Sequence, residues 1–365
     1  MKRVADLDTP ALLVDLDRME ANLRRVADYT RAHGLRLRPH TKTHKSPRIG
    51  RRQLDLGAAG LTVAKVGEAE VMLDAAPPDL LVAFPVIGRP KLDRLMAVAR
   101  RTRVTVSLDS LVAAQQLSEA AQAAGVRVGV LAEADVGLGR VGVSPGAELL
   151  DLARGIARLP GLTLEGIAFY PGHIKDGSET GRQALAALGT LIGSILDELR
   201  RAGLEARIVS GGSTPSLYHS HELPGLNEIR PGTYVFNDWN TVVSGAATLE
   251  ECAATLLVTV VSTARPGQII VDGGSKTFSS DRPSGSGDVT FGHVLDAPGA
   301  AFHKMNEEHG YIDVRNCDRR FSIGERLHII PNHICVAVNL HERVYGIRGE
   351  EVEEVWEVAG RGKLQ

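Results

Sequence analysis

The sequence predicts an α/β fold, a TIM-like (β/α)8 barrel followed by a mainly β C-terminal domain. Over the first two thirds of the 365 residues, short apolar runs alternate with amphipathic helical stretches. Parallel βα units produce this alternation, and eight units suit a closed barrel. After about residue 245 the alternation stops, and β-branched, strand-like runs follow one another with short turns.

Eight predicted barrel strands occupy residues 35–41, 60–65, 79–85, 103–109, 127–135, 162–170, 206–212 and 226–232. Between them, residues 90–101, 110–125 and 181–203 place apolar side chains at helical spacing. A doubly wound open sheet also fits this pattern. We expect a barrel over residues 17–245 and a β domain over 246–365, which residues 1–16 join through an N-terminal strand.

Composition favours a compact cytoplasmic enzyme. A net charge of -2 and 43% apolar residues allow a large core and leave no basic excess for nucleic acid. No segment approaches the roughly 18 uncharged apolar residues of a membrane span, and the start of the chain does not resemble a signal peptide. Cys252, Cys317 and Cys335 are widely spaced, which argues against a disulfide framework.

The stretch LRLRPHTKTHKS, residues 35–46, carries a potential cation at every second position: Arg38, His40, Lys42 and His44. Alternate side chains of a strand share one face, and four cations on one face repel one another. The pattern predicts either a solvent-exposed basic edge or a face that binds an anion.

The predicted barrel strands end in residues suited to chemistry, as the carboxyl ends of barrel strands do in enzymes. The strand over 206–212 runs into GGSTPS, where Gly212 lets backbone N–H groups approach an anion, and Ser213 and Thr214 can donate hydrogen bonds. An ordinary turn is the alternative for this composition. A lysine together with a phosphate cradle in a barrel indicates pyridoxal phosphate, whose aldehyde requires an amine. Lys42 would supply that amine, and Arg38 and His40 would neutralise the anionic cofactor and the substrate carboxylate.

A second informative stretch is PNHICVAV, which reads as a strand. His333 and Cys335 are two residues apart, so on a strand both side chains would point the same way, as two ligands of one divalent ion must. Imidazole with thiolate prefers zinc to magnesium, and manganese is also compatible. A strand histidine beside a buried cysteine, with no metal, is the alternative.

Several motifs together resemble the fold-type III pyridoxal-phosphate enzymes, in particular the D-threonine aldolase and D-serine dehydratase group, which shares its barrel with alanine racemase. They are DTPALLVDLDRMEANL, LRPHTKTHKSP, AKVGEAEV, DVGLGRVGV, GGSTPS, RPGTYVFND, VDGGSKTFSSD, EEHG and PNHICVAVNL. The resemblance implies that Lys42 carries the cofactor, that Arg140 lies near its phenolic oxygen and that Tyr170 lies beside its ring. It also implies the phosphate ligands Gly212, Ser213, Thr214, Gly232 and Thr233.

The resemblance further implies a divalent metal at His333 and Cys335, near the β-hydroxyl of a small D-3-hydroxy amino acid, and an active site near a homodimer interface. It favours the D-threonine aldolase reaction, a retro-aldol cleavage to glycine and an aldehyde. The H-x-C pattern matches the dehydratases instead, which eliminate the hydroxyl to give a 2-oxo acid and ammonia. His173, in YPGH, is either a general base or a helix-capping residue.

Two other classes stay open at this point. A racemase fits a barrel with a β domain but requires a second acid or base, for which Tyr311 and Tyr345 are the tyrosines of the β domain. A non-catalytic pyridoxal-phosphate carrier fits the cradle but has no use for a β domain. Glu308 and His309 could support the metal or the substrate, or could form a solvated turn.

Overall fold

The computed structural model describes residues 2–175, 178–283 and 290–365. The chain forms two compact units, each assembled from separate segments. Their segments are Met1–Arg24, Thr43–Lys45 and Thr233–Arg361 for the β unit, and Arg25–Lys42, Ser46–Gly232 and Gly362–Gln365 for the barrel unit.

The barrel unit contains an eight-stranded parallel sheet in the order β3-β10-β9-β8-β7-β6-β5-β4. The strands are β3 (Arg36–Leu37), β4 (Leu61–Val63), β5 (Asp79–Val82), β6 (Arg103–Leu108), β7 (Val128–Ala134), β8 (Leu162–Phe169), β9 (Ile208–Gly211) and β10 (Glu228–Ile229). An isolated parallel bridge between His40 and Thr62 joins the two ends of this order. The predicted barrel is therefore confirmed, and the open-sheet alternative is wrong.

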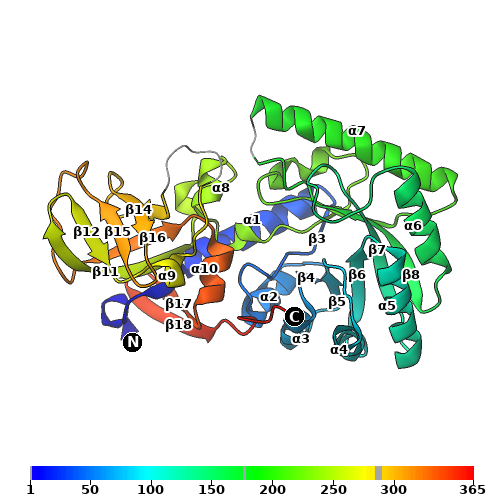
Figure 1. Cartoon of the computed structure of the whole chain (residues 1–365), viewed down its shortest axis with the longest axis horizontal. Helices are drawn as coiled ribbons and strands as arrows, with labels where there is room; N and C mark the ends of the chain where they lie inside the picture. Colours follow the sequence, from blue (N-terminus) through cyan, green and yellow to red (C-terminus); the bar gives the residue numbers. More distant parts are fainter. Residues whose placement is uncertain (1, 176–177, 284–289) are drawn as a thin grey trace. The chain divides into compact units, whose positions relative to one another are not determined.

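Helices alternate with these strands and cover the outside of the sheet (Figure 1). They are α1 (Leu16–Ala32), α2 (Pro47–Asp55), α3 (Val66–Met72), α4 (Arg89–Ala99), α5 (Leu111–Ala124), α6 (Ala147–Arg158) and α7 (Glu179–Arg201). Strands β3 and β10 are much shorter than predicted. Pro39 and Pro231 follow them closely, and proline lacks the N–H group that a strand ladder needs.

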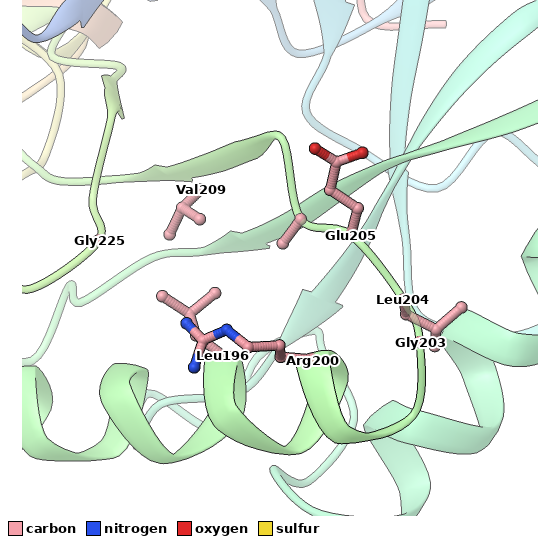
Figure 2. Close-up of a pocket in the computed structure, with 8 residues that line it drawn as sticks. Leu196, Arg200, Gly203, Leu204, Glu205, Val209 and Gly225 are labelled. Atoms are coloured by element: carbon pink, nitrogen blue, oxygen red, sulfur yellow. The ribbon is translucent and has the colours of Figure 1, made fainter.

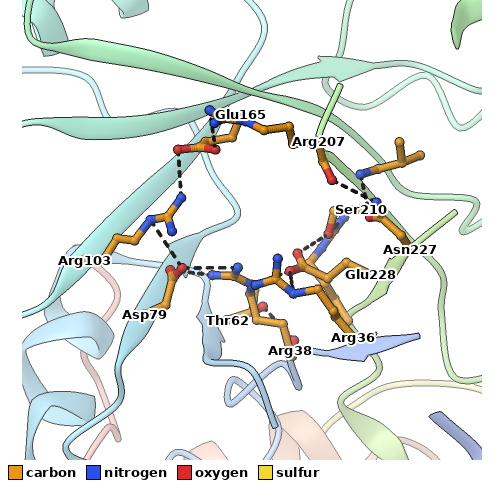
Figure 3. A network of polar contacts seen from close by, with 12 residues as sticks. Arg36, Arg38, Thr62, Asp79, Arg103, Glu165, Arg207, Ser210, Asn227 and Glu228 are labelled. Atoms are coloured by element: carbon orange, nitrogen blue, oxygen red, sulfur yellow. Dashed lines mark hydrogen bonds and ion pairs between the residues drawn. The ribbon is translucent and has the colours of Figure 1, made fainter. Parts of the chain in front are cut away.

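A belt of ion pairs joins the strands of the barrel (Figure 3). Arg38 is 1% exposed and lies between two carboxylates, with Nη1 2.5 Å from Asp79 Oδ1 and Nε 2.9 Å from Glu228 Oε2. Burial lowers the pKa of Arg38, but its attraction to the two carboxylates outweighs burial and raises the pKa overall. Arg103 and Arg207 continue the belt by pairing with Glu165. The prediction that Arg38 meets the cofactor or substrate is therefore wrong, because Asp79 and Glu228 occupy its guanidinium group.

The β unit contains a ten-stranded sheet with the order β1-β18-β17-β2-β11-β12-β15-β14, in which β16 pairs with β11 and β13. Its strands are β1 (Lys2–Arg3), β2 (Ala11–Asp15), β11 (Ala254–Arg265), β12 (Gln268–Val271), β13 (Gly292–Val294), β14 (Ala301–Met305), β15 (Gly310–Asp313), β16 (Arg326–Pro331), β17 (Arg343–Arg348) and β18 (Glu351–Glu357). The short helices α8 (Trp239–Val243), α9 (Ser275–Phe278) and α10 (Ile334–Leu340) complete it. Strand β2 pairs with β11 on one side and with β17 on the other, so the N-terminal segment lies inside this sheet.

Replacement of Arg38 by methionine tests the belt. The variant Arg38→Met leaves the buried Asp79 and Glu228 with only longer ion-pair contacts, at 3.7 Å to Arg103 and 3.9 Å to Arg36, and we expect a loss of about 3–5 kcal/mol in the free energy of unfolding. Thermal and urea unfolding measure this loss. The control Arg51→Met removes an exposed pair with Asp55 and should change the same free energy by less than about 1 kcal/mol. Equal stabilities of the two variants would contradict the assigned role of Arg38.

Candidate active site

Lys42 lies in a turn at the carboxyl end of the first barrel strand. The chain leaves β3 at Leu37, His40 bridges to Thr62, and residues 41–44 form a turn in which Lys42 is exposed. The N–H of Lys42 donates to His40 Nδ1 over 3.4 Å. The predicted strand with four cations on one face is therefore wrong, because the extended backbone stops before Lys42.

Lys45 is the nearest alternative to Lys42 as the cofactor lysine, and on a strand it would point to the opposite face. In the structure it lies in the β unit and has a different environment. It is 5% exposed, adopts a left-handed backbone conformation with φ 50°, and its Nζ donates to Gly360 O over 3.2 Å. The strand alternation expected to separate the two lysines does not apply in a turn. Burial and hydrogen bonding of Lys45 distinguish them instead.

Arg140, Tyr170 and His173 meet where two loops pack after β7 and β8. The guanidinium carbon of Arg140 lies 4.8 Å from the centroid of the Tyr170 ring, a cation–π contact. A Cβ atom built on Gly137 would lie 3.3 Å from His173 Cε1, so the imidazole packs directly on that glycine. Arg140 and Tyr170 are thus in contact, and His173 packs on the loop that carries Arg140, at the carboxyl ends of neighbouring strands.

The carboxylate of Asp135 holds the loop that carries Arg140. It accepts hydrogen bonds from the N–H groups of Gly137, Leu138 and Gly139 at 3.0 to 3.1 Å. The hydrogen bonds from Gly137 and Gly139 are the main reason that the pKa of Asp135 is lowered. The loop is therefore organised around one ionised side chain.

The segment after β9 has the features of an anion cradle. Gly212 adopts φ 86°, a backbone conformation that favours glycine, while Ser213 and Thr214 are buried. A Cβ atom on the preceding Gly211 would lie 2.3 Å from the Phe169 ring, so only glycine fits there. Within residues 2–175, 178–283 and 290–365, the N–H groups of Gly212, Ser213 and Thr214 have no hydrogen-bond acceptor. Buried N–H groups without a partner are costly, and an oxyanion would satisfy them.

The other two predicted phosphate ligands follow β10. Gly232 is buried and ends a segment of the barrel unit, whereas Thr233 begins the β unit and the short 3-10 helix Thr233–Val235. Arg230, two residues before Gly232, donates to Ser210 Oγ and to Phe169 O. Burial lowers the pKa of this arginine, which the sequence analysis did not single out.

His333 and Cys335 come together in the β unit, although not on a strand. Strand β16 ends at Pro331, His333 is the N-cap residue of α10, and Cys335 lies in the first turn of that helix. The predicted strand over residues 325–338 is therefore wrong in its second half. The two side chains are still hydrogen-bonded to each other, and the negative charge of the Cys335 thiolate is the main cause that raises the pKa of His333 to about 11.

Asp238 positions His333, and sequence reasoning missed it. Its Oδ2 lies 3.0 Å from His333 Nδ1 and accepts the N–H of Ile334 at 3.1 Å, while its Oδ1 caps α8 through the N–H of Thr241. Because Asp238 occupies Nδ1, the other ring nitrogen is the one left for the hydrogen bond with Cys335. Thr43 Oγ1 lies 3.2 Å from Cys335 Sγ, in the same unit. Asp238 ends the motif RPGTYVFND of the family resemblance, but that motif gave no sign of a histidine partner.

Among the described residues, no three histidine, cysteine, aspartate or glutamate side chains form a group that could hold a metal ion. His333 and Cys335 could supply two ligands, which leaves further positions to water or substrate. Glu308 forms an ion pair with Lys276 at 2.6 Å, and His309 lines a cavity of about 550 Å³ together with Tyr311. The carboxylate of Glu308 thus has a local structural partner.

A further cavity, of about 490 Å³, lies between α7 and the residues that lead into β9 (Figure 2). Leu196 and Arg200 of α7 line it, together with Leu204 and Val209. It opens at the amino end of β9, whereas the predicted cradle follows the carboxyl end. None of the candidate residues lines this cavity.

These features define a barrel enzyme of the alanine racemase class. The family described as "Alanine racemase, N-terminal domain" matches residues 14–238, and a serine dehydratase domain family matches residues 253–347. The chain belongs to this family of pyridoxal-phosphate enzymes, as the resemblance of its motifs indicated. In the described part of the chain, no helix is both long and apolar enough to cross a membrane.

The chain is similar over almost its whole length to curated aldolases. It is 33% identical to the D-threonine aldolase of an Arthrobacter species over 372 residues, which covers 98% of this chain and 94% of that protein. It is 34% identical to the 3-hydroxy-D-aspartate aldolase of Paracoccus denitrificans, with 98% and 93% covered.

Solved structures of the same family superpose closely. The D-threonine aldolase of Filomicrobium marinum matches with a TM-score of 0.93 and 34% identity, covering 100% of this chain and 98% of that one. The D-threo-3-hydroxyaspartate dehydratase of Delftia sp. HT23 matches with a TM-score of 0.88 and 32% identity, covering 98% and 99%. Two variants of that dehydratase have also been solved. One replaces a histidine by alanine, and the other, in a metal-free form, replaces a cysteine two residues farther on.

The variant Asp135→Ala tests how the loop carrying Arg140 is held. We expect faster hydrogen exchange at Gly137, Leu138 and Gly139, whose N–H groups lose their acceptor. In the unaltered protein, these three amides should stay protected against hydrogen exchange at pH values above the ordinary aspartate pKa of about 3.9. This protection should be lost as the pH falls through the lower pKa of the folded state. The control Asp55→Ala removes an exposed carboxylate and should leave these amides unchanged.

Proposed function

We propose that this protein is a pyridoxal-phosphate- and divalent-metal-dependent lyase that cleaves D-3-hydroxy amino acids by a retro-aldol reaction of the D-threonine aldolase type. One observation carries the proposal. An exposed lysine, Lys42, and a buried row of unpaired N–H groups at residues 212–214 lie at the carboxyl ends of strands in one barrel. An amine and an anion cradle at one rim suit this cofactor, and the aldolase relatives cover almost the entire chain.

The residues of the barrel rim would hold the cofactor as follows. Lys42 supplies the amine, and the N–H groups of Gly212, Ser213 and Thr214, with Gly232 and Thr233, bind the phosphate. Arg140 would lie near the phenolic oxygen and Tyr170 beside the ring, while His40 would neutralise the anionic cofactor or the substrate carboxylate. The hydrogen bonds of Asp135 hold the loop that carries Arg140. Pyridoxal phosphate, when bound, supplies an electron sink for charge that develops at the substrate α-carbon.

His333 and Cys335 would bind the metal, zinc or manganese, and substrate and water would fill the remaining positions. The spacing of the two residues is that of the histidine and cysteine substituted in the Delftia dehydratase variants. Asp238 is a positioning residue here, since a carboxylate that accepts from Nδ1 fixes the imidazole and increases its basicity. The softness of thiolate and imidazole disfavours magnesium.

His173 is the proposed general base. In the aldolase reaction it would remove the proton of the β-hydroxyl as the Cα–Cβ bond breaks, which releases the aldehyde, and a proton delivered to the α-carbon would complete glycine. Dehydration is the second candidate, because the pair His-x-Cys also occurs at the substituted positions of a dehydratase. In that reaction the base would take the α-proton, the hydroxyl would leave as water, and hydrolysis of the resulting imine would give a 2-oxo acid and ammonia. We also propose that the protein works as a homodimer in the cytoplasm.

Product analysis decides between the two reactions. The purified protein, loaded with pyridoxal phosphate and with zinc or manganese, is incubated with D-threonine. We expect glycine and acetaldehyde, and loss of both products and of the visible cofactor absorption in Lys42→Ala. The conservative control Lys45→Arg should retain the cofactor absorption. A yield of 2-oxobutanoate and ammonia would overturn the aldolase assignment in favour of dehydration, and interconversion of D- and L-amino acids would indicate a racemase.

The variant Asp238→Asn tests the metal site without relying on turnover. The side-chain oxygen of asparagine can still cap α8. Its amide nitrogen, which replaces the second oxygen, cannot accept a hydrogen bond from His333 Nδ1. We expect zinc affinity, measured by competition with a chelator, to fall by roughly 10- to 100-fold. The control Asp15→Asn alters a carboxylate that binds the N–H of Arg18 and should leave zinc affinity unchanged. Unaltered affinity in Asp238→Asn would contradict the positioning role.

A further inference from the structure

Lys65 lies at the carboxyl end of β4, the strand next to the segment that carries Lys42. The bridge between His40 and Thr62, and the hydrogen bond from Thr41 N to Thr62 O at 2.8 Å, keep these two strand ends in register. Lys65 follows β4 by two residues, as Lys42 follows His40 by two. Both lysines therefore leave the barrel at the same rim.

The ammonium group of Lys65 rests on an aromatic ring. Its Nζ lies 3.5 Å from the centroid of Phe84, which follows the neighbouring strand β5. The pairing of Val63 with Val82 and the hydrogen bond from Ala83 N to Val63 O at 2.9 Å bring the two residues to the same level. Phe84 is 42% exposed although it is large and apolar. The ring therefore supports the lysine at the barrel mouth and does not fill the core.

Lys65 differs from Arg38 and Arg94 in having no acidic partner among the described residues. Within residues 2–175, 178–283 and 290–365, no carboxylate lies within ion-pair distance of its Nζ. Arg38 is saturated by Asp79 and Glu228, and Arg94 pairs with Glu70. Glu68, three residues after Lys65, is buried and accepts the N–H of Ala64. A cation on an aromatic face, partly withdrawn from water, is well placed to bind an anionic ligand.

The strand order indicates which anion this is. Around the barrel the sequence of neighbours is β9, β10, β3, then β4 through the bridge of His40 with Thr62. The phosphate cradle follows β9 and β10, on one side of Lys42, whereas Lys65 follows β4, on the other side. The phosphate of a cofactor attached at Lys42 is therefore bound away from Lys65. A carboxylate of the substrate is the anion that remains.

We infer that Lys65 is a specificity-determining residue that binds the distal carboxylate of a 3-hydroxy-D-aspartate-type substrate. The inference rests on the proposed function and narrows it to D-3-hydroxy amino acids with an anionic β-substituent. Phe84 is the positioning residue that holds the ammonium group toward the barrel mouth. Substrates with a neutral β-substituent, such as D-threonine, gain nothing from this contact.

The test compares KM for 3-hydroxy-D-aspartate and D-threonine in the holoenzyme and three variants. Lys65→Met removes the charge and keeps the length, Lys65→Arg keeps the charge, and Phe84→Leu removes the aromatic face. We expect Lys65→Met to raise KM for 3-hydroxy-D-aspartate by roughly 10- to 100-fold, as for loss of a hydrogen bond to a charged group. KM for D-threonine should stay within about twofold. In Lys65→Arg, KM for 3-hydroxy-D-aspartate should stay close to that of the unaltered enzyme. Phe84→Leu should raise KM for this anionic substrate alone, and by less than Lys65→Met does.

Equal rises of KM for both substrates in Lys65→Met, or none for either, would overturn the inference. A second readout does not need turnover. The cofactor absorption of the holoenzyme is titrated with D-aspartate and with D-alanine, and Lys65→Met should weaken only the binding of D-aspartate. If the unaltered enzyme cleaves neither hydroxy amino acid, the proposed function fails, while this titration still decides the role of Lys65.

Discussion

The buried ion pairs of Arg38 fix the segment on which the proposed chemistry depends. Strands β3 and β10 pair over only two residues each, and backbone hydrogen bonds from Arg38 to Ile229 and from His40 to Pro231 extend this pairing beyond the strands. Arg38 adds two short contacts, to Glu228 on β10 and to Asp79 on β5, in a site shielded from water. The low local dielectric strengthens these contacts. The turn with Lys42 begins three residues beyond Arg38, so the buried ion pairs and the backbone hydrogen bonds of His40 and Thr41 together fix the point from which it starts.

The fold could be predicted because the local periodicity of the sequence indicates its strands and helices. The ion-pair partners of charged residues could not be predicted in this way. Alternating strand and helix patterns gave eight parallel strands and a β domain, and the structure contains both. The alternation of Arg38, His40, Lys42 and His44 was equally visible, yet its interpretation as one cationic face was wrong. Arg38 meets Asp79 and Glu228, which are 41 and 190 residues away in the chain. Periodicity reports which residues share a face, but not which distant carboxylate lies opposite.

In the candidate site, too, local patterns could be predicted from the sequence but contacts between distant residues could not. His333 and Cys335 were paired from a strand pattern, but the backbone bends into α10 between them. Their side chains meet because His333 is an extended N-cap residue with φ -135° and ψ 111°, and not because of strand alternation. Asp238 lies 95 residues before His333, so no local pattern could reveal their hydrogen bond. Glycines were more informative. The run after β9 pointed to an anion cradle, and Gly211 and Gly212 lie where a side chain would clash or strain the backbone.

Strand β2 limits how the β unit could be exchanged between proteins by recombination. The strand comes from the first 15 residues yet lies between β11 and β17, and Thr43–Lys45 is also part of that unit. A gene segment that encodes residues 246–365 alone would leave the sheet open in its middle, with two unpaired edges that invite aggregation. Recombination can therefore exchange the two units only by replacing several gene segments together.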